Sequence, residues 1–129
     1  MILVDSDVLI AHLRGVDAAR EWLRDARTGS GSLAVSVVSL AEVTGGMRSH
    51  ERRAVWRLLD SLVVHDVSVV IARAAGEFMR QHRRTHPGIG LADYLIAATA
   101  EVAGLELATL NVKHFPMFKG LRPPFRLPG

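Results

Sequence analysis

Residues 1–10 read "MILVDSDVLI", and the fold of the chain can be worked out from this stretch. Its apolar start is followed at once by two acids, Asp5 and Asp7, after which the chain becomes apolar again. A short apolar run that ends at polar residues indicates a buried strand, and a longer apolar stretch beyond them favours a helix. We therefore predict a strand over residues 2–4 and a helix over residues 8–13, with the two acids between them.

The same alternation of short apolar runs and helical patterns continues along the chain. Further strands are predicted over residues 33–35, 63–64 and 105–109, and further helices over residues 18–27 (N-cap Asp17, broken by "TGSGS" at 28–32), 36–47, 50–62, 67–84 and 91–102. The proline-rich tail at 121–129 is predicted to form no more than a short edge strand. Strands that alternate with helices predict a three-layer α/β/α domain around a central parallel sheet. We expect residues 1–129 to form one such domain.

Composition narrows the class of protein. The chain has 129 residues, with sixteen Lys and Arg, thirteen Asp and Glu, and no cysteine. The lack of cysteine excludes disulfides, thiolate-bound zinc and cysteine nucleophiles. We find neither a signal peptide nor an apolar stretch of membrane-spanning length, and so expect a cytoplasmic protein without membrane attachment. The basic excess fits either a solvated surface or an anionic partner, and composition does not choose between them.

Polar side chains follow the predicted strands at the points where the strands end. Asp5 and Asp7 come directly after the first strand, Glu42 lies one helical turn beyond the second, and Asn111 follows the fourth. Asp93 opens the helix before that fourth strand, in the apolar segment "GLADYLIAA". Because ligands of parallel sheets bind beyond the carboxyl ends of the strands, we expect these side chains to gather at one edge.

Each acid also has a structural explanation. Asp5 or Ser6 can cap a helix, Glu42 stands three residues after Ser39 as in a capping box, and Asp93 lies in a first helical turn. Together, however, several partly buried carboxylates repel one another unless a cation compensates them. Oxygen ligands without cysteine suit Mg²⁺ or Mn²⁺, and such an ion can polarise a phosphoryl oxygen and acidify a water molecule.

Three segments resemble one known family. They are "MILVDSDVLIAHLRG" (1–15), "SVVSLAEVTGGM" (36–47) and "GIGLADYLIAATAEVAGLELATLNVKHFPMF" (88–118). In order and spacing they resemble the PIN-domain ribonucleases, and in particular the VapC toxins of bacterial toxin–antitoxin pairs. The resemblance implies an α/β/α fold and endonucleolytic cleavage of RNA that depends on Mg²⁺ or Mn²⁺. It also implies that the catalytic, metal-binding acids are Asp5, Glu42 and Asp93.

The resemblance extends to the residues around these acids. Asp7 stands where the family often has Ser, Asn or Asp, which implies a secondary role. The family often has a fourth acid where this chain has Asn111, whose amide oxygen can ligate an ion but supplies no charge. We therefore expect one bound ion. Ser6 and Thr109 are expected to hydrogen-bond the ligands from behind.

The family also implies partners. A VapC toxin inhibits translation and growth, is neutralised by a VapB-type antitoxin that places a basic side chain in the acidic pocket, and commonly forms a homodimer within a toxin–antitoxin hetero-oligomer. Trp22, Trp56 and Phe78 are candidates for the exposed apolar positions that such contacts need, although side chains of these types more often belong to a core. Arg14 and Lys113 are candidates for contacts to RNA phosphates, with a solvated surface as the alternative.

Three other functions fit parts of the sequence less well. The opening also fits the DxDxV motif of haloacid-dehalogenase-like phosphatases, but the chain lacks the GDxxxD-like segment that those enzymes need. A non-catalytic module that binds RNA or an antitoxin is favoured only by Asn111. Metal-free acid–base cleavage would need a paired histidine, and neither His12 nor His114 has an evident partner in the sequence.

Overall fold

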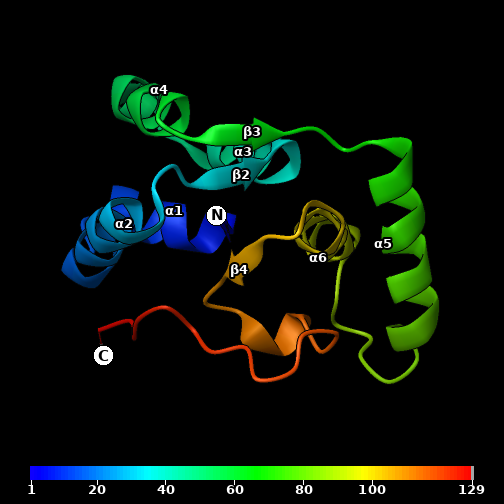
Figure 1. Cartoon of the computed structure of the whole chain (residues 1–129). Helices are drawn as coiled ribbons and strands as arrows, with labels where there is room; N and C mark the ends of the chain where they lie inside the picture. Colours follow the sequence, from blue (N-terminus) through cyan, green and yellow to red (C-terminus); the bar gives the residue numbers. More distant parts are fainter. Residues whose placement is uncertain (129) are drawn as a thin grey trace.

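The computed structural model describes residues 1–128 and has a four-stranded sheet at its centre, with strand order β3-β2-β1-β4 (Figure 1). The strands are β1 (Ile2–Val4), β2 (Ala34–Ser36), β3 (Val63–His65) and β4 (Glu106–Ala108). All three neighbouring pairs are parallel. The predicted parallel sheet is confirmed, and each predicted strand overlaps an observed one.

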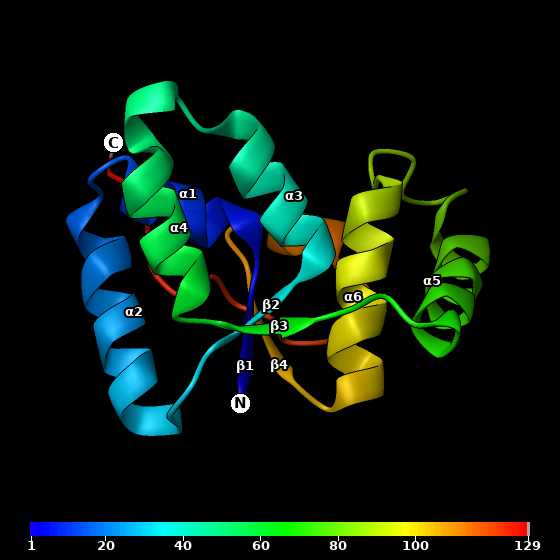
Figure 2. The same ribbon diagram turned by 90° about the horizontal axis from the view of Figure 1, so that it is seen from above.

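Six α-helices and two short 3₁₀ helices surround the sheet. They are α1 (Ser6–Leu13), α2 (Asp17–Ser30), α3 (Val37–Gly46), η1 (Ser49–Glu51), α4 (Arg52–Asp60), α5 (Val69–His82), α6 (Leu91–Ala103) and η2 (Val112–His114). Helices α1, α2 and α4 lie toward one side of the sheet and α5 and α6 toward the other, with α3 between the two groups, which confirms the three-layer α/β/α class (Figures 1 and 2). Within the described residues, no helix is both long enough and apolar enough to cross a membrane.

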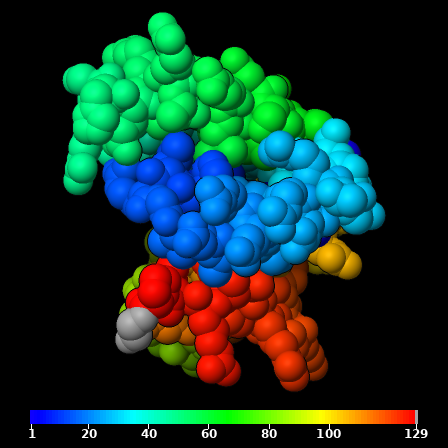
Figure 3. Space-filling model, turned by 90° about the vertical axis from the view of Figure 1, so that its left-hand side faces the viewer, coloured from blue at the N-terminus to red at the C-terminus, as the bar shows by residue number. Residues whose placement is uncertain are grey.

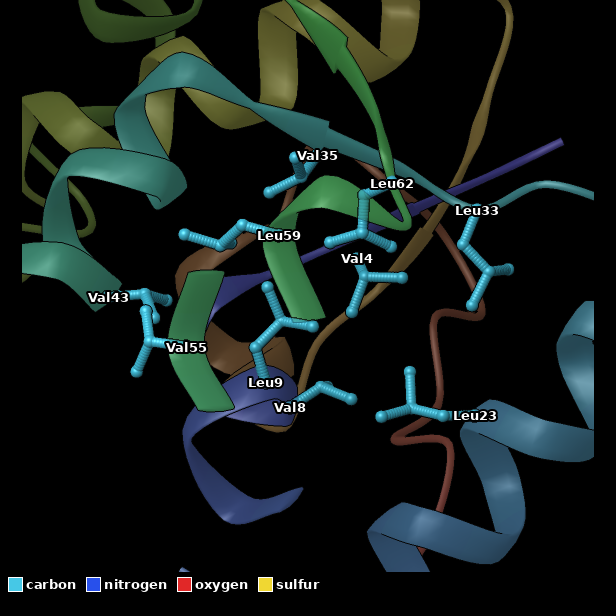
Figure 4. Close-up of a cluster of buried hydrophobic side chains, with 10 residues drawn as sticks. All are labelled: Val4, Val8, Leu9, Leu23, Leu33, Val35, Val43, Val55, Leu59 and Leu62. Atoms are coloured by element: carbon cyan, nitrogen blue, oxygen red, sulfur yellow. The ribbon is translucent and has the colours of Figure 1, made fainter. Parts of the chain in front are cut away.

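The apolar strands are explained by burial on both faces of the sheet. Val4 and Val35 join the cluster formed with α1 to α4 (Figure 4), whereas their neighbours Leu3 and Ala34 join the cluster formed with α6. Successive residues of a strand point to opposite faces, so both must be apolar when helices cover both faces. This is why the start of the chain reads as continuous core until the first acid.

The second helix differs from its prediction at both ends. Val16, not Asp17, is the N-cap residue, and Asp17 is the first helical residue. The helix also continues through the first part of "TGSGS", because Thr28 and Ser30 donate their hydroxyl hydrogens to carbonyl oxygens four residues earlier, at 3.0 and 2.7 Å. The helix stops at Gly31, which has a φ of 80°, a backbone conformation that glycine adopts easily because it has no side chain.

The third helix is capped by Ser36, whose hydroxyl accepts a hydrogen bond from the backbone N–H of Val38 at 3.1 Å. Ser39 is buried inside the helix, so the suggested capping box between Ser39 and Glu42 is wrong. The tail forms no strand in its described part, residues 121–128, and Gly129 lies outside the described residues.

Candidate active site

Asp5 links the first strand to the first helix. Its backbone N–H donates to the Ala108 carbonyl at 2.9 Å, which extends the pairing of β1 with β4 by one residue. Its side chain caps α1, because Oδ1 accepts from the Ser6 N–H at 2.7 Å. The other carboxylate oxygen, Oδ2, accepts from the Thr109 hydroxyl at 2.8 Å. Asp5 is only 5% exposed, so this carboxylate is held on both oxygens inside the protein.

Thr109 also brings in the second acid of the opening motif. Its Oγ1 lies 3.2 Å from Asp7 Oδ2, and the same oxygen accepts from the Leu110 N–H at 3.0 Å. The other oxygen, Asp7 Oδ1, is buried and has no hydrogen-bond partner among the described residues. Asp5 and Asp7 therefore lie on either side of one hydroxyl group, and one of their four oxygens is unsatisfied.

Glu42 reaches this group from α3. The Ser6 hydroxyl donates to Glu42 Oε1 at 3.1 Å, and Ser6 is the residue whose N–H binds Asp5. Glu42 itself lies on the exposed side of α3. Ser6 and Thr109 thus join three carboxylates from two elements into one hydrogen-bonded group, which we call the acidic group: Asp5, Asp7 and Glu42.

Asp93 belongs to a second, neighbouring group. Its Oδ2 accepts from the Gly90 N–H at 3.3 Å and lies 3.0 Å from His114 Nδ1. The same Nδ1 lies 2.8 Å from Asn111 Nδ2. If Nδ1 carries a proton, His114 donates it to the Asp93 carboxylate. If Nδ1 carries a lone pair, it accepts a hydrogen bond from the Asn111 side-chain amide. The tautomer of His114 therefore decides which of the two hydrogen bonds forms.

The two groups are joined by the chain segment that leaves β4. The Asn111 N–H donates to Thr109 Oγ1 at 3.1 Å, and Thr109 in turn donates to Asp5. Asn111 therefore contacts the acidic group through its backbone and the Asp93–His114 pair through its side chain.

Burial and mutual repulsion dominate the electrostatics of the acidic group. Burial, together with the neighbouring charges of Asp7 and Glu42, raises the pKa of Asp5 from 3.8 to about 7. The hydrogen bonds from Thr109 and Ser6 act in the opposite direction but do not cancel it. Burial also raises the pKa of Asp7, against the hydrogen bond from the Leu110 N–H. A nearby cation would reverse both pKa rises.

Not every predicted site residue is drawn into one cluster. Among the described residues, no three acidic or histidine side chains converge closely enough to form a preassembled metal site. Arg14 lies at the far end of α1 from Asp5 and forms an ion pair with Glu51, so it is not among these acids. Lys113 is exposed on η2, beside Asn111 and His114.

The contact between His114 and Asp93 was missed from the sequence. His114 was considered there only as an unpaired acid–base residue, because its partner lies 21 positions away along the chain. A signal was present in the spacing: Asn111 and His114 are three residues apart, which places them on one side of a tight turn.

The family model of the PIN domain matches residues 2–116 of the chain. The chain belongs to the PIN-domain family. Membership decides between the two interpretations of residues 1–10, in favour of the PIN domain and against the haloacid-dehalogenase-like phosphatases. The match runs from the first strand through η2, and so includes both hydrogen-bonded groups.

The relatives of this PIN domain confirm the resemblance to VapC proteins. The chain is 67% identical to Ribonuclease VapC10 of Mycobacterium tuberculosis over 100% of its own length and 96% of that protein. It is 39% identical to Ribonuclease VapC19 of the same organism, over 97% of its length and 100% of that protein. Among solved structures, a chain of a toxin–antitoxin complex from Klebsiella pneumoniae superposes with a TM-score of 0.82 at 25% identity, covering 97% of this chain and 98% of that one.

Proposed function

We propose that this PIN domain is a metal-dependent endoribonuclease and the toxin of a VapBC-type pair. The observation that carries the proposal is the acidic group, in which a carboxylate at the carboxyl edge of the sheet has its pKa raised to about 7. A folded protein tolerates such repulsion where a bound cation relieves it. Support for the substrate comes from the relatives, two of which are named as ribonucleases.

The donor set fits a hard divalent ion, and we infer that it is Mg²⁺, with Mn²⁺ as a substitute. All candidate ligands are oxygen donors, and Asp7 Oδ1 is a buried carboxylate oxygen without a hydrogen-bond partner in the described part of the chain. Asp5, Glu42 and Asp93 would hold the ion, with Asp7 and Asn111 as further candidates. When bound, the ion supplies Lewis acidity that polarises the scissile phosphate and acidifies the attacking water.

Neighbouring residues of the chain orient these acids. Ser6 and Thr109 hold the two oxygens of Asp5, so that this carboxylate cannot rotate freely. Both hydrogen bonds of Asp93 end on Oδ2. They fix the orientation of the carboxylate and leave Oδ1 without a hydrogen bond to residues 1–128, available to a metal ion. We infer that His114 is a positioning residue for Asp93, and that the neutral amide of Asn111 keeps a further negative charge out of the site, which favours one bound ion over two.

Binding of the RNA backbone needs cations near the acids. Lys113 is the better placed of the two predicted residues, because it is exposed on η2 next to both Asn111 and His114. Arg14 forms an ion pair with Glu51 at the C-terminal end of α1, and we assign it no contact with the scissile phosphate. The ammonium group of Lys113 would bind a phosphate as a single positive charge, without the two parallel hydrogen bonds that an arginine can form.

The test is a cleavage assay with purified protein and total RNA, followed by mapping of the new RNA ends. We expect cleavage with Mg²⁺ or Mn²⁺, none with EDTA, and none for Asp5→Asn or Asp93→Asn. Asp25→Asn, which removes an exposed acid of α2, serves as the matched control and should cleave normally. Cleavage that persists in EDTA would disprove the metal mechanism, and RNA binding without cleavage would instead favour the non-catalytic module.

The partners are proposed on the same basis. We infer that the chain forms a homodimer, binds a VapB-type antitoxin as a hetero-oligomer in the cytoplasm, and inhibits translation and growth when the antitoxin is absent. The Klebsiella neighbour is described as a toxin–antitoxin complex. Co-expression with the product of the adjacent reading frame should give one complex by size-exclusion chromatography and restore growth. Growth inhibition that the co-expressed protein does not relieve would contradict this assignment.

A further inference from the structure

A basic surface lies on α4, away from the two groups of site residues. Helix α4 buries Val55 and Leu59 against the core, and its opposite side faces outward. A shallow hollow of about 690 Å³ lies along that outer side. The residues of interest in its lining are His50, Arg52, Arg53, Trp56 and Arg57. We call the four members from the helix the α4 patch: Arg52, Arg53, Trp56 and Arg57.

Trp56 is the aromatic member of the patch. It is 40% exposed, and it is the one aromatic side chain among the large apolar residues exposed in the described part of the chain. Trp22 and Phe78, the other two positions considered for partner contacts, are partly buried against the core clusters. Arg53 and Arg52 precede Trp56 by three and four residues, the spacings that place side chains together on one helix face, and Arg57 lies four residues after Arg53.

The arginines of the patch are not neutralised by acids. Other arginines of the chain form ion pairs, as Arg80 does with Glu77 and Arg14 with Glu51. In residues 1–128, no ion pair involves Arg52, Arg53 or Arg57. Glu51, the nearest acid in sequence, is already held by Arg14 and by the Arg48 N–H. Asp60, at the far end of the hollow, is the one acid in its lining.

The start of the patch lies at the same end of the molecule as the acidic group. Strands β2 and β3 are parallel, so the chain must leave the carboxyl edge through α3 and return through α4. The N-terminus of α4, with Arg52 and Arg53, therefore lies on the side of the carboxyl edge, as Figure 2 shows. In the space-filling view the chain around α4 (green) forms the upper margin of the molecule, above the blue surface of α1 and α2 (Figure 3).

We propose that the α4 patch binds a single-stranded segment of the RNA substrate outside the cleavage site, with the arginines on phosphates and Trp56 stacked on one base. Unpaired arginines match a polyanion in charge, and an exposed indole is a stacking surface for an unpaired base of any kind. The identity of the ligand as RNA rests on the proposed function. Trp and Arg also occur often in protein interfaces, so the observation that favours RNA is the positive charge of three arginines without paired acids, which the phosphates of a polyanion would balance.

The first experiment measures RNA affinity in the full-length protein carrying Asp5→Asn, so that the probe is not cut. The probe is a labelled single strand of oligouridylate, about 12 nucleotides long. Trp56→Ala should weaken binding by about tenfold, and Trp56→Phe should keep most of the affinity, because a phenyl ring still stacks. Replacing Arg53 and Arg57 by Ala should reduce the slope of log K against log salt by about 2.

The matched control is Arg80→Ala, because this exposed arginine of α5 is paired with Glu77. It should leave both the affinity and the salt slope unchanged. Thermal melting of every variant separates lost binding from lost folding. Unchanged affinity in both the Trp56→Ala and the arginine variants would overturn the proposal. So would variants that keep RNA affinity but lose affinity for the antitoxin, because the patch would then be a protein interface.

The second experiment uses fluorescence. The chain has two tryptophans, so Trp22→Phe leaves Trp56 as the sole reporter. We expect single-stranded RNA to quench this signal and duplex RNA of equal length to quench it much less, and equal quenching by both would overturn the stacking. These outcomes can be told apart from a failure of the proposed function. If the protein does not cleave RNA but binds it through the patch, only the proposed ribonuclease activity is refuted. If it cleaves RNA and no patch variant changes cleavage, only RNA binding by the patch is refuted.

Discussion

Asp5 and Asp93 are the two acids assigned most directly to catalysis, and the protein holds them in opposite ways. Asp5 is 5% exposed, has both oxygens hydrogen-bonded and has a pKa of about 7. The side chain of Asp93 is 23% exposed, and its hydrogen bonds all converge on one oxygen. Asp5 is therefore fixed in place before any ion binds, and its buried charge lowers the stability of the fold. Asp93 lies nearer the surface and is held through one oxygen, so its carboxylate has more freedom to move.

The largest effect is expected from Asp5→Asn, which tests whether the buried carboxylate is needed for cleavage and whether it destabilises the fold. We expect cleavage to be lost while the metal-free protein becomes more stable at pH 8, on the order of 4 kcal/mol in the free energy of unfolding, because the pKa of Asp5 is raised from 3.8 to about 7. Asparagine keeps the helix cap but carries no charge to bury. Activity and urea unfolding of the same preparation check the two halves of the prediction. Asp17→Asn, at an acid whose side chain is 80% exposed, should change neither quantity.

The buried charge also predicts how stability depends on pH. Because the folded pKa of Asp5 is raised from 3.8 to about 7, the folded state holds a proton that the unfolded state has released. Stability of the metal-free protein should therefore be greatest below pH 4 for this group. It should fall by about 1.4 kcal/mol per pH unit toward pH 7.

The measurement is the difference in unfolding free energy between wild type and Asp5→Asn at several pH values, since the histidines then cancel. Saturating Mg²⁺ should flatten the wild-type curve, because an ion that binds the ionised carboxylate opposes the loss. A difference that does not vary between pH 4 and pH 7 would contradict the raised pKa.

On the adjustable side, His114→Ala should weaken metal binding and cleavage by about 10- to 100-fold, because Asp93 loses the partner that orients it. His114→Asn should recover part of both, since its amide can occupy the place of Nδ1. Calorimetric titration with Mn²⁺ and cleavage rates check the two effects. Equal loss in the Ala and Asn variants would mean that His114 acts in some way other than through Nδ1.

The smallest effects are expected from the two cations first assigned to phosphate. Lys113→Ala should raise KM for RNA several-fold and leave kcat nearly unchanged, because the residue lies beside the site without touching the acids. Arg14→Ala should leave both constants unchanged and cost less than about 1 kcal/mol of stability, since its ion pair with Glu51 is partly exposed. A higher KM for Arg14→Ala than for Lys113→Ala would reverse the assignment.

Much of the fold could be predicted because burial on both faces leaves a clear pattern. The strand at residues 2–4 is apolar throughout and the strand at residues 34–36 is apolar up to Ser36, and Asp5 and Ser36 mark the carboxyl edge. Helix caps were harder, because several residues compete for each one. Ser36 caps α3 in place of Ser39 because the chain leaves its extended conformation at Ser36, where ψ is 148°.

The candidate site divides along the same line. Asp5, Asp7 and Glu42 follow from their places after strands, since parallel strands bring their ends together whatever their distance in sequence. The pairing of His114 with Asp93 could not be found this way, because it depends on how η2 turns back toward α6. The ion pair of Arg14 with Glu51 could not be predicted for a similar reason, because its two residues lie on different helical segments and 37 positions apart.

The hydrogen bond from Thr109 to Asp5 also has a consequence for the order of synthesis. Its two residues are 104 positions apart, so the acidic group cannot close until β4 has paired with β1. Chains emerge from the ribosome with their N-terminus first, and contacts of high sequence separation form late. Asp5 is therefore synthesised 104 positions before Thr109, and the nascent chain cannot hold its carboxylate on both oxygens until β4 has been made.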